Sequence, residues 1–195
     1  MINKDKMIAV ILTGGKSKRY GSDKSFLKIG KITFIEKQIK LLTKYFDTIV
    51  VSANEDEKYK HLNLPICNDI YSDCGPLAGI HAVMKKYKKN LFVLACDLPF
   101  VDDKTIKNIL KFKSDADMIF SATKQNMQPL CAIYKINLLP NLDKYLKSNN
   151  RSVFKFIENI NHSVIQIKTV REKLININTQ EDYNKLIKGN INGTK

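Results

Sequence analysis

A loop rich in glycine and basic side chains follows the first apolar run, Met7–Leu12. It reads Thr13-Gly14-Gly15-Lys16-Ser17-Lys18-Arg19-Tyr20-Gly21-Ser22-Asp23-Lys24, with three glycines and four basic residues. Glycines let the backbone approach a phosphate and point N–H groups at it, and the cations neutralise its charge. The spacing matches neither G-x-G-x-x-G nor the Walker A pattern. Composition therefore predicts a phosphate-binding loop, with a solvated Gly/Lys turn as the alternative.

A single carboxylate at the end of an apolar strand is the second signal. Asp97 follows Leu91–Cys96 directly and precedes Leu98-Pro99-Phe100. Such a carboxylate suits Mg²⁺, because this hard ion takes few protein oxygens and completes its octahedron with phosphates and waters. Taken alone, Asp97 fits a turn before Pro99 equally well.

A third signal combines an acidic residue with the start of a helix. Asp69 follows the short apolar run Leu64–Cys67, and Gly75-Pro76-Leu77-Ala78-Gly79 then opens a helical pattern. These residues would place backbone groups and a carboxylate on the same side of the sheet as the first two signals. The alternatives are an ordinary proline at a helix start and a surface turn at Asp69.

The elements that must position these residues alternate along the chain. We expect strands at Met7–Leu12, Thr48–Ala53, Leu91–Cys96, Asp117–Ala122, Leu130–Tyr134 and Val164–Lys168. We expect helices at Thr33–Tyr45, Leu77–Tyr87, Asp103–Phe112, Leu138–Lys147, Val153–Asn159 and Gln180–Ile187. Strands that are apolar throughout indicate a sheet covered on both faces, and the alternation indicates right-handed crossovers. The sequence thus predicts an α/β fold with three layers and a doubly wound, mostly parallel sheet, in which ligands bind beyond the carboxyl ends of the strands.

Length and composition narrow the function classes. The 195 residues fit one domain, and 44% hydrophobic residues with no long apolar run are typical of a globular protein without a membrane span. The 33 basic and 19 acidic residues give a net charge of +14. Only Arg19, Arg151 and Arg171 are arginine, and the lysines are spread along the chain except for Lys85–Lys89. We therefore interpret the charge as solvated surface and expect no nucleic-acid partner, with a polyanion patch at Lys85–Lys89 as the alternative.

The cysteines and the N-terminus indicate the compartment. Cys67, Cys74, Cys96 and Cys131 show no C-x-x-C spacing and are expected to be buried thiols in a reducing environment. The apolar run Met7–Leu12 is too short for the core of a signal peptide. We therefore expect a cytoplasmic protein.

Six motifs in order resemble a known family over nearly the whole chain. Leu12-Thr13-Gly14-Gly15-x-Ser17-x-Arg19-x-Gly21-x-Asp23-Lys24 is similar to the signature of the nucleotidyltransferases that act on the molybdenum cofactor, above all the guanylyltransferases among them. The likeness continues through Gly75–Gly79, Cys96–Phe100, Gln128–Tyr134, Arg151–Val153 and Asn176–Thr179. Thr13 and Tyr20 stand where that family usually has Ala and Met.

The resemblance implies a fold and a reaction. The fold would be the Rossmann-like nucleotidyltransferase fold, in one domain over residues 1–195, with a nucleotide part at about 1–110 and a pterin part at about 111–190. The reaction would be the Mg²⁺-dependent transfer of GMP from GTP to molybdenum-bound molybdopterin, which gives the guanine dinucleotide cofactor and pyrophosphate. Such a step needs positioning and charge neutralisation more than acid–base chemistry. It also implies proteins that deliver the pterin and molybdoenzymes that accept the cofactor, and we expect the enzyme to be a monomer.

The resemblance also assigns roles to residues of this chain. Catalytic roles would fall to Lys16, Arg19, Lys24 and Asp97, with Asp97 on the metal and Lys16 and Arg19 on the β and γ phosphates. Contacts to GTP would come from Leu12, Thr13, Gly14, Gly15, Lys24, Asn54, Asp69 and Asp97. Contacts to the pterin substrate would come from Gln128, Arg151, Ser152, Asn176 and Asn178. Arginine at 19 and 151 in a lysine-rich chain favours bidentate phosphate contacts at these positions.

Guanine presents two adjacent hydrogen-bond donors, and one carboxylate can accept from both. We therefore expect Asp69 to contact the base or the ribose, and GTP to be preferred over CTP.

Two other functions stay open at this point. A related enzyme that uses CTP, or one that acts on a sugar phosphate or an isoprenoid precursor, would share the glycine loop and Asp97. A basic nucleic-acid-binding domain without catalysis would account only for the net charge. His61, His81 and His162 show no arrangement for nucleophilic catalysis and are expected to be structural or solvated.

Overall fold

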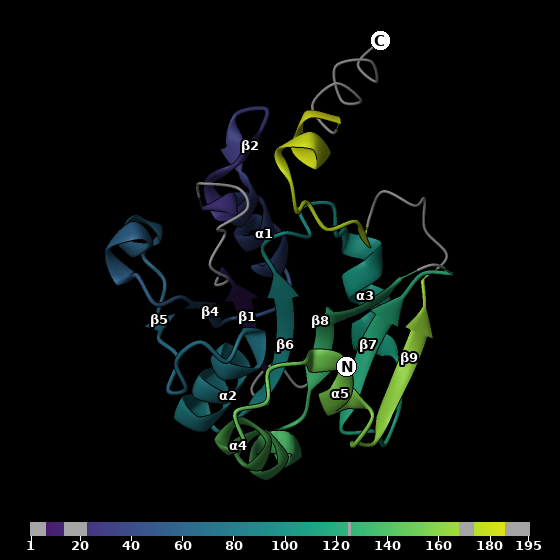
Figure 1. Cartoon of the computed structure of the whole chain (residues 1–195). Helices are drawn as coiled ribbons and strands as arrows, with labels where there is room; N and C mark the ends of the chain where they lie inside the picture. Colours follow the sequence, from purple (N-terminus) through teal and green to yellow (C-terminus); the bar gives the residue numbers. More distant parts are fainter. Residues whose placement is uncertain (1–6, 14–22, 125, 168–173, 186–195) are drawn as a thin grey trace.

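The computed structural model describes residues 7–13, 23–124, 126–167 and 174–185 and has a seven-stranded sheet at its centre. The strands are β1 (Met7–Leu12), β4 (Ile49–Ser52), β5 (Ile66–Cys67), β6 (Asn90–Ala95), β7 (Met118–Ala122), β8 (Met127–Tyr134) and β9 (His162–Gln166). Their order across the sheet is β5-β4-β1-β6-β8-β7-β9 (Figure 1). β8 runs antiparallel to β6 and β7, and all other neighbours are parallel. The predicted, mostly parallel sheet is confirmed.

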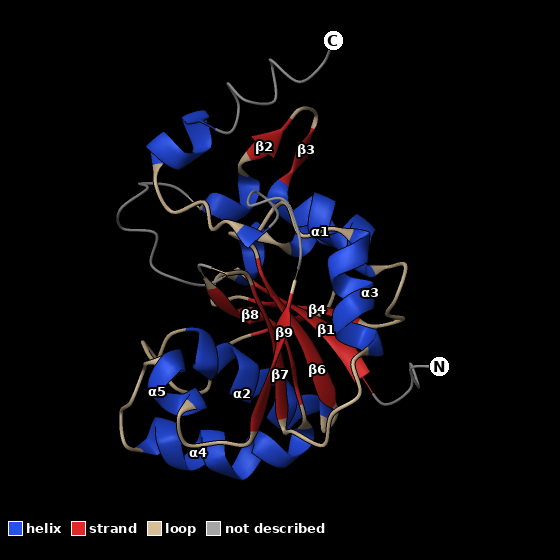
Figure 2. Cartoon of the chain, turned by 90° about the vertical axis from the view of Figure 1, so that its right-hand side faces the viewer, coloured by secondary structure: helices blue, strands red, loops and turns tan. Residues whose placement is uncertain are grey.

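Helices cover both faces of this sheet. α1 (Phe34–Leu42) and α3 (Asp103–Lys111) lie on one face, and α2 (Pro76–Tyr87), α4 (Leu139–Lys147) and α5 (Val153–Ile157) lie on the other (Figure 2). Smaller elements are the hairpin β2 (Lys28–Ile29) and β3 (Ile32–Thr33) and the 3-10 turns η2 (Lys24–Phe26), η3 (Asp56–Lys58), η4 (Lys60–Leu62) and η5 (Ile136–Leu138). The expected three-layer, doubly wound α/β architecture is therefore confirmed.

The continuous apolar character of the strands follows from these two layers. In β1, Ala9 and Ile11 pack into the core beneath α1 and α3, whereas Ile8 and Val10 pack into the core beneath α2 and α4. Side chains alternate between the two faces of a strand, so a strand covered on both faces must be apolar at every position. The burial of all four cysteines as free thiols follows from the same packing and confirms that prediction.

Several boundaries differ from the sequence predictions. α1 ends at Leu42 rather than Tyr45, and its start is fixed by a capping box between Thr33 and Glu36. β8 begins at Met127 rather than Leu130, because a bulge opposite Phe120 and Ser121 accommodates Pro129 within the ladder.

The end of the chain differs in a similar way. β9 spans His162–Gln166 rather than Val164–Lys168, because its ladder to β7 begins where Met118 pairs with His162. Residues 180–185 are helical as expected, and the remainder of that predicted helix, like Lys168, falls outside the described residues. Within the ranges given above, each helix is too short or too polar to cross a lipid bilayer.

Candidate functional site

The register of the sheet brings three strand ends together. Leu12, the last residue of β1, pairs with Ser52 of β4 and Ala95 of β6. The Thr13 backbone N–H and hydroxyl both donate to the Ser52 carbonyl, at 3.2 and 2.9 Å. The residues that follow these strands therefore share one edge of the sheet, which is the edge where the sequence predicts the ligands.

A cavity of about 670 Å³ lies at this edge. Its size falls in the usual range for small-molecule sites. It is lined by Leu12, Thr13, Asp23, Ser52, Ala53, Asn54, Glu55, Tyr59, Asp69, Asp73, Gly75, Pro76, Gly79 and Arg151. The cavity thus brings together five predicted residues, namely Leu12, Thr13, Asn54, Asp69 and Arg151.

Asn54 and Asp69 hold each other in the cavity wall. The Asn54 amide donates to Asp69 Oδ2 at 2.9 Å, and the Asp69 backbone N–H donates to Asn54 Oδ1 at 2.8 Å. Burial raises the pKa of Asp69 above its ordinary value, and the hydrogen bond from Asn54 partly offsets this rise. This pairing fixes the orientation of the Asp69 carboxylate. A fixed orientation is what a group needs if it is to recognise a ligand.

Helix α2 packs closely against the strand ends at Gly79. No side chain larger than a hydrogen atom fits at this position. A Cβ placed on Gly79 would lie 2.2 Å from Ser52 Oγ, 3.2 Å from Leu12 Cδ2 and 3.3 Å from Asp69 Oδ1. Gly75, which precedes the helix, has a φ of +67° that favours glycine, and its own Cβ position lies 3.8 Å from the Arg151 carbonyl. Gly79 therefore permits the close approach of α2 to the strand ends, and Gly75 permits the backbone conformation that precedes the helix.

We expect Gly79→Ala to destabilise the protein and to narrow the cavity. The added methyl group overlaps Ser52 Oγ, and overpacking of this kind costs about 1–3 kcal/mol. Thermal unfolding should show a lower Tm, and nucleotide binding should weaken. Adding Ser52→Ala removes the overlapping atom, so the double variant should recover most of the lost stability. Equal Tm values for Gly79→Ala and wild type would contradict the close approach.

Asp97 forms the centre of a second group beside the cavity. Its Oδ1 atom is buried without a hydrogen-bond partner in the described part of the chain. Burial raises the pKa of Asp97, and a hydrogen bond from Asn176 and the charge of Lys24 oppose this rise. A buried carboxylate oxygen left without a partner fits a cation ligand, because unpaired buried charge is costly.

The segment that carries Asn176 and Asn178 crosses the end of β6. Residues 174–185 are yellow in Figure 1 and lie beyond the arrowhead of β6, where the Ile177 N–H donates to the Asp97 carbonyl at 2.9 Å. Gln128 Nε2 donates to Asn176 Oδ1 at 2.8 Å and to the Leu174 carbonyl at 2.7 Å. Lys24 Nζ donates to Asn178 Oδ1 at 3.2 Å. The structure thus gathers four predicted residues around Asp97: Lys24, Gln128, Asn176 and Asn178.

Two of the predicted pterin contacts, Arg151 and Ser152, do not lie beside Gln128, Asn176 and Asn178. Arg151 lines the cavity, apart from Gln128 and the two asparagines with which the sequence groups it. The Ser152 hydroxyl accepts the Lys155 N–H at 3.3 Å and caps α5. Gly14, Gly15, Lys16 and Arg19 lie outside the described residues.

Sequence reasoning also missed residues of this site. Asp23, Ser52, Glu55, Tyr59 and Asp73 line the cavity without having been singled out as ligands. Asp23 stood in the quoted loop motif beside Lys24, so its position was a usable signal. No local pattern indicated Tyr59, because the residue it contacts, Asp23, lies 36 residues earlier in the sequence.

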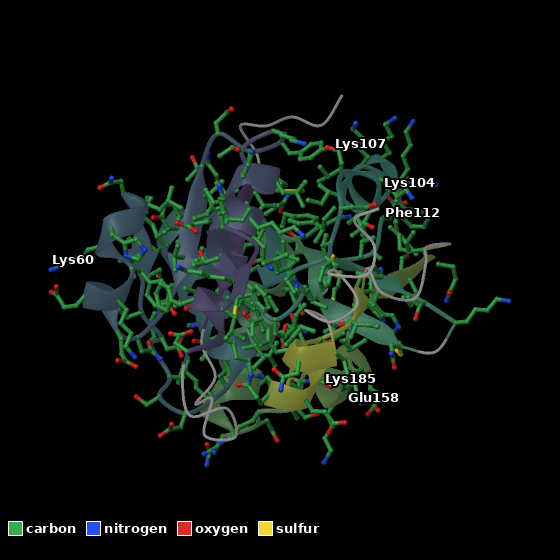
Figure 3. The ribbon with its side chains drawn as sticks, turned by 90° about the horizontal axis from the view of Figure 1, so that it is seen from above. Lys60, Lys104, Lys107, Phe112, Glu158 and Lys185 are labelled. Atoms are coloured by element: carbon green, nitrogen blue, oxygen red, sulfur yellow. The ribbon has the colours of Figure 1, made fainter. Side chains whose placement is uncertain are left out.

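Basic side chains of the described residues lie on more than one side of the molecule. Lys60 lies on one margin of the molecule, and Lys104 and Lys107 lie on the opposite one (Figure 3). Lys60, Lys107 and Lys185 also pair with the acidic residues Glu57, Asp103 and Glu181 on their own turns or helices. Such pairs are typical of a solvated surface.

Comparison with known proteins supports one family. The model of the MobA-like NTP transferase domain matches residues 9–164. A Clostridium perfringens protein named "Probable molybdenum cofactor guanylyltransferase" is 36% identical and covers 94% of this chain and 97% of its own. The molybdenum cofactor guanylyltransferase of Desulfosudis oleivorans is 30% identical, covering 93% and 94%. The crystal structure of molybdopterin-guanine dinucleotide biosynthesis protein A from Archaeoglobus fulgidus has a TM-score of 0.80 at 20% identity, covers 95% and 99% of the two chains, and shows the same fold.

Proposed function

The chain belongs to the MobA-like NTP transferase family, and on this premise we propose that it transfers GMP from GTP to molybdenum-bound molybdopterin. An oxygen of the terminal phosphate of the pterin forms a bond to the α-phosphorus of GTP. The bond from the α-phosphorus to the bridging oxygen of the β-phosphate breaks, and pyrophosphate leaves with that electron pair. The observation that carries the proposal is the full-length likeness to molybdenum cofactor guanylyltransferases, of which two are 30% and 36% identical to this chain.

The cavity is proposed to hold GTP. Leu12, Thr13 and the reciprocal pair Asn54 and Asp69 would contact the guanosine, with Gly14 and Gly15 adding backbone groups. Lys16 and Arg19 would hold the β and γ phosphates, and Lys24 would reach the α-phosphate beside Asp97. The reciprocal hydrogen bonds of Asn54 and Asp69 support this assignment, because they fix a half-buried carboxylate in the cavity wall.

The pterin is proposed to enter from the side of Gln128, Asn176 and Asn178. These side chains surround Asp97, so an acceptor phosphate held there would face the α-phosphorus. Arg151, which lines the cavity, and Ser152 beside it would contact the acceptor phosphate where the two substrates meet. This assignment keeps a nucleotide part at about residues 1–110 and a pterin part at about 111–190 within one domain.

Mg²⁺ fits this arrangement through Asp97. In the described residues no cluster of three or more His, Cys, Asp or Glu side chains forms a metal site. A single carboxylate suffices for Mg²⁺ that is also held by phosphates and water, and the unpaired buried Oδ1 of Asp97 is such a ligand. When bound, Mg²⁺ would neutralise charge on the phosphates. Lys24 and the loop cations would orient the phosphates, and the cavity walls would limit the access of water.

We expect a strong preference for GTP over CTP. A site whose buried groups match one base leaves them unpaired with another, so kcat/KM should favour GTP by about 10²-fold or more. Steady-state pyrophosphate release with each nucleotide measures this ratio. If CTP is the better substrate, the chain is a cytidylyltransferase and the proposed donor is wrong.

Asp69→Ala should lower kcat/KM for GTP, because the base or ribose loses a fixed acceptor. The matched control is Glu57→Ala, which removes a carboxylate from the same connection between β4 and β5. Glu57 is exposed, pairs with Lys60 and does not line the cavity, so this variant should keep the activity of wild type. Equal losses in both variants would indicate a general effect of charge rather than a contact of Asp69.

We further propose that the enzyme acts in the cytoplasm as a monomer that receives the pterin from a delivery protein and passes the product to molybdoenzymes. The buried free thiols support a reducing compartment. Sedimentation at micromolar concentration tests the monomer directly.

A further inference from the structure

The hydroxyl of Tyr59 is hydrogen-bonded to the residue that follows the glycine-rich loop. It donates to Asp23 Oδ2 at 2.6 Å and lies 3.0 Å from Ser25 Oγ. Thr13, which precedes residues 14–22, lines the same cavity as Tyr59 and Asp23. The phenol group thus holds the residue at one end of residues 14–22.

Asp23 transmits this contact to Lys24. The Asp23 carboxylate caps the 3-10 turn η2 by accepting the Ser25 N–H at 3.0 Å and the Ser25 hydroxyl at 2.6 Å. Lys24 is the first residue of η2, so its direction depends on the orientation of that turn. Its amine donates to Asn178 and acts electrostatically on Asp97.

The surroundings of Tyr59 restrict it to this geometry. Its side chain is 2% exposed, and its ring stacks on Phe26 of η2 with centroids 5.3 Å apart. Burial and the hydrogen bond to Asp23 raise the pKa of Tyr59, so the phenol stays protonated and continues to donate. Tyr59 comes from the connection between β4 and β5, which also carries Asn54 of the cavity wall.

We propose that Tyr59 is a positioning residue that holds the Asp23 carboxylate and thereby holds Lys24 against the reacting phosphates. The proposal rests on the proposed function, because Lys24 acts there on the transferred phosphate. A tie of this kind acts on geometry rather than on nucleotide contacts. Its loss should therefore affect turnover more than affinity.

Tyr59→Phe tests the tie, because it removes one oxygen and keeps the ring on Phe26. We expect kcat for GTP-dependent pyrophosphate release to fall by about 10- to 10²-fold, the size of effect that a small misplacement causes. The KM for GTP should stay near that of wild type. Asp23→Ala, which removes the acceptor of the Tyr59 proton, should show at least the same loss, and adding Tyr59→Phe to it should cause no further loss.

Tyr45→Phe is the matched control. The Tyr45 hydroxyl also donates to an aspartate, Asp103 Oδ1 at 2.5 Å, but that bond joins the turn after α1 to α3, and neither residue lines the cavity. Loss of either bond should lower the Tm by a similar amount. Only Tyr59→Phe should lower kcat, and parallel losses of kcat in both variants would overturn the proposal.

A second measurement does not depend on the pterin reaction. Lys24 is half-buried and hydrogen-bonded, whereas Lys28 is exposed. Labelling with an amine-reactive reagent, followed by mass spectrometry, should modify Lys24 several-fold faster in Tyr59→Phe than in wild type, with Lys28 as the internal reference. Unchanged labelling of Lys24, or a wild-type kcat in Tyr59→Phe, would overturn the positioning role. A wild type that labels as expected but does not transfer GMP would instead refute the proposed function and leave the tie intact.

Discussion

Replacing Asp97 with asparagine is expected to lower kcat for pyrophosphate release by about 10²- to 10³-fold, the effect of losing several kcal/mol of charge stabilisation. The amide keeps the shape of the carboxylate but lacks the charge that offsets a divalent cation. Kinetics at saturating Mg²⁺ and GTP measure this loss. Asp115→Asn, which neutralises an exposed aspartate far along the chain, is the control and should keep full turnover. Turnover near wild type in Asp97→Asn would contradict the metal assignment.

The same variant should not be less stable than wild type at neutral pH. Burial raises the pKa of Asp97 above 3.8, so the ionised carboxylate is less favourable in the folded protein than in the unfolded chain. The free energy of unfolding of the wild type should therefore decrease as the pH rises from 3.8 through the raised pKa. That of Asp97→Asn should not show this decrease. A Tm equal to or above that of wild type, together with lost turnover, would separate chemistry from folding.

Replacing Lys24 with glutamine is expected to lower kcat by about 10²-fold or more, because an ammonium group in a partly dry site stabilises charge that develops on the phosphates. Lys24 reaches Asn178 at 3.2 Å, and its charge lowers the pKa of Asp97. Its removal should therefore raise the pKa of Asp97 further and move the acidic limb of the pH–activity profile to higher pH. Lys28→Gln, four residues away on the exposed hairpin strand β2, is the matched control. An unchanged acidic limb with near wild-type kcat would contradict the role of Lys24.

Local patterns were sufficient for the main elements and for the residues that follow them. The apolar runs of β1 and β6 are continuous because both faces are covered, so the sequence identifies the strands, and Thr13 and Asp97 follow at their ends. The order of Gln128, Asn176 and Asn178 in the motifs also led to a shared site. Their convergence on Asp97 follows from the course of residues 174–178 over β6.

Contacts between distant segments could not be predicted in this way. Nothing local to Tyr59 indicates that its hydroxyl meets Asp23, since the contact depends on how the connection between β4 and β5 folds over η2. The cavity position of Arg151 depends on the packing of the segment after α4 against Gly75. The early start of β8 depends on a bulge within β8 opposite Phe120 and Ser121, because Pro129 by itself argues against a ladder.

The transfer of GMP to the pterin can be followed through the fate of each phosphate of GTP. Enzyme, Mg²⁺ and molybdenum-bound molybdopterin are incubated with GTP labelled at the α-phosphate or at the γ-phosphate, and the products are separated. We expect the α label in a pterin guanine dinucleotide and the γ label in pyrophosphate, in equal amounts and only when the pterin is present. Release of the γ label as orthophosphate, or an α label that never joins the pterin, would contradict this transfer.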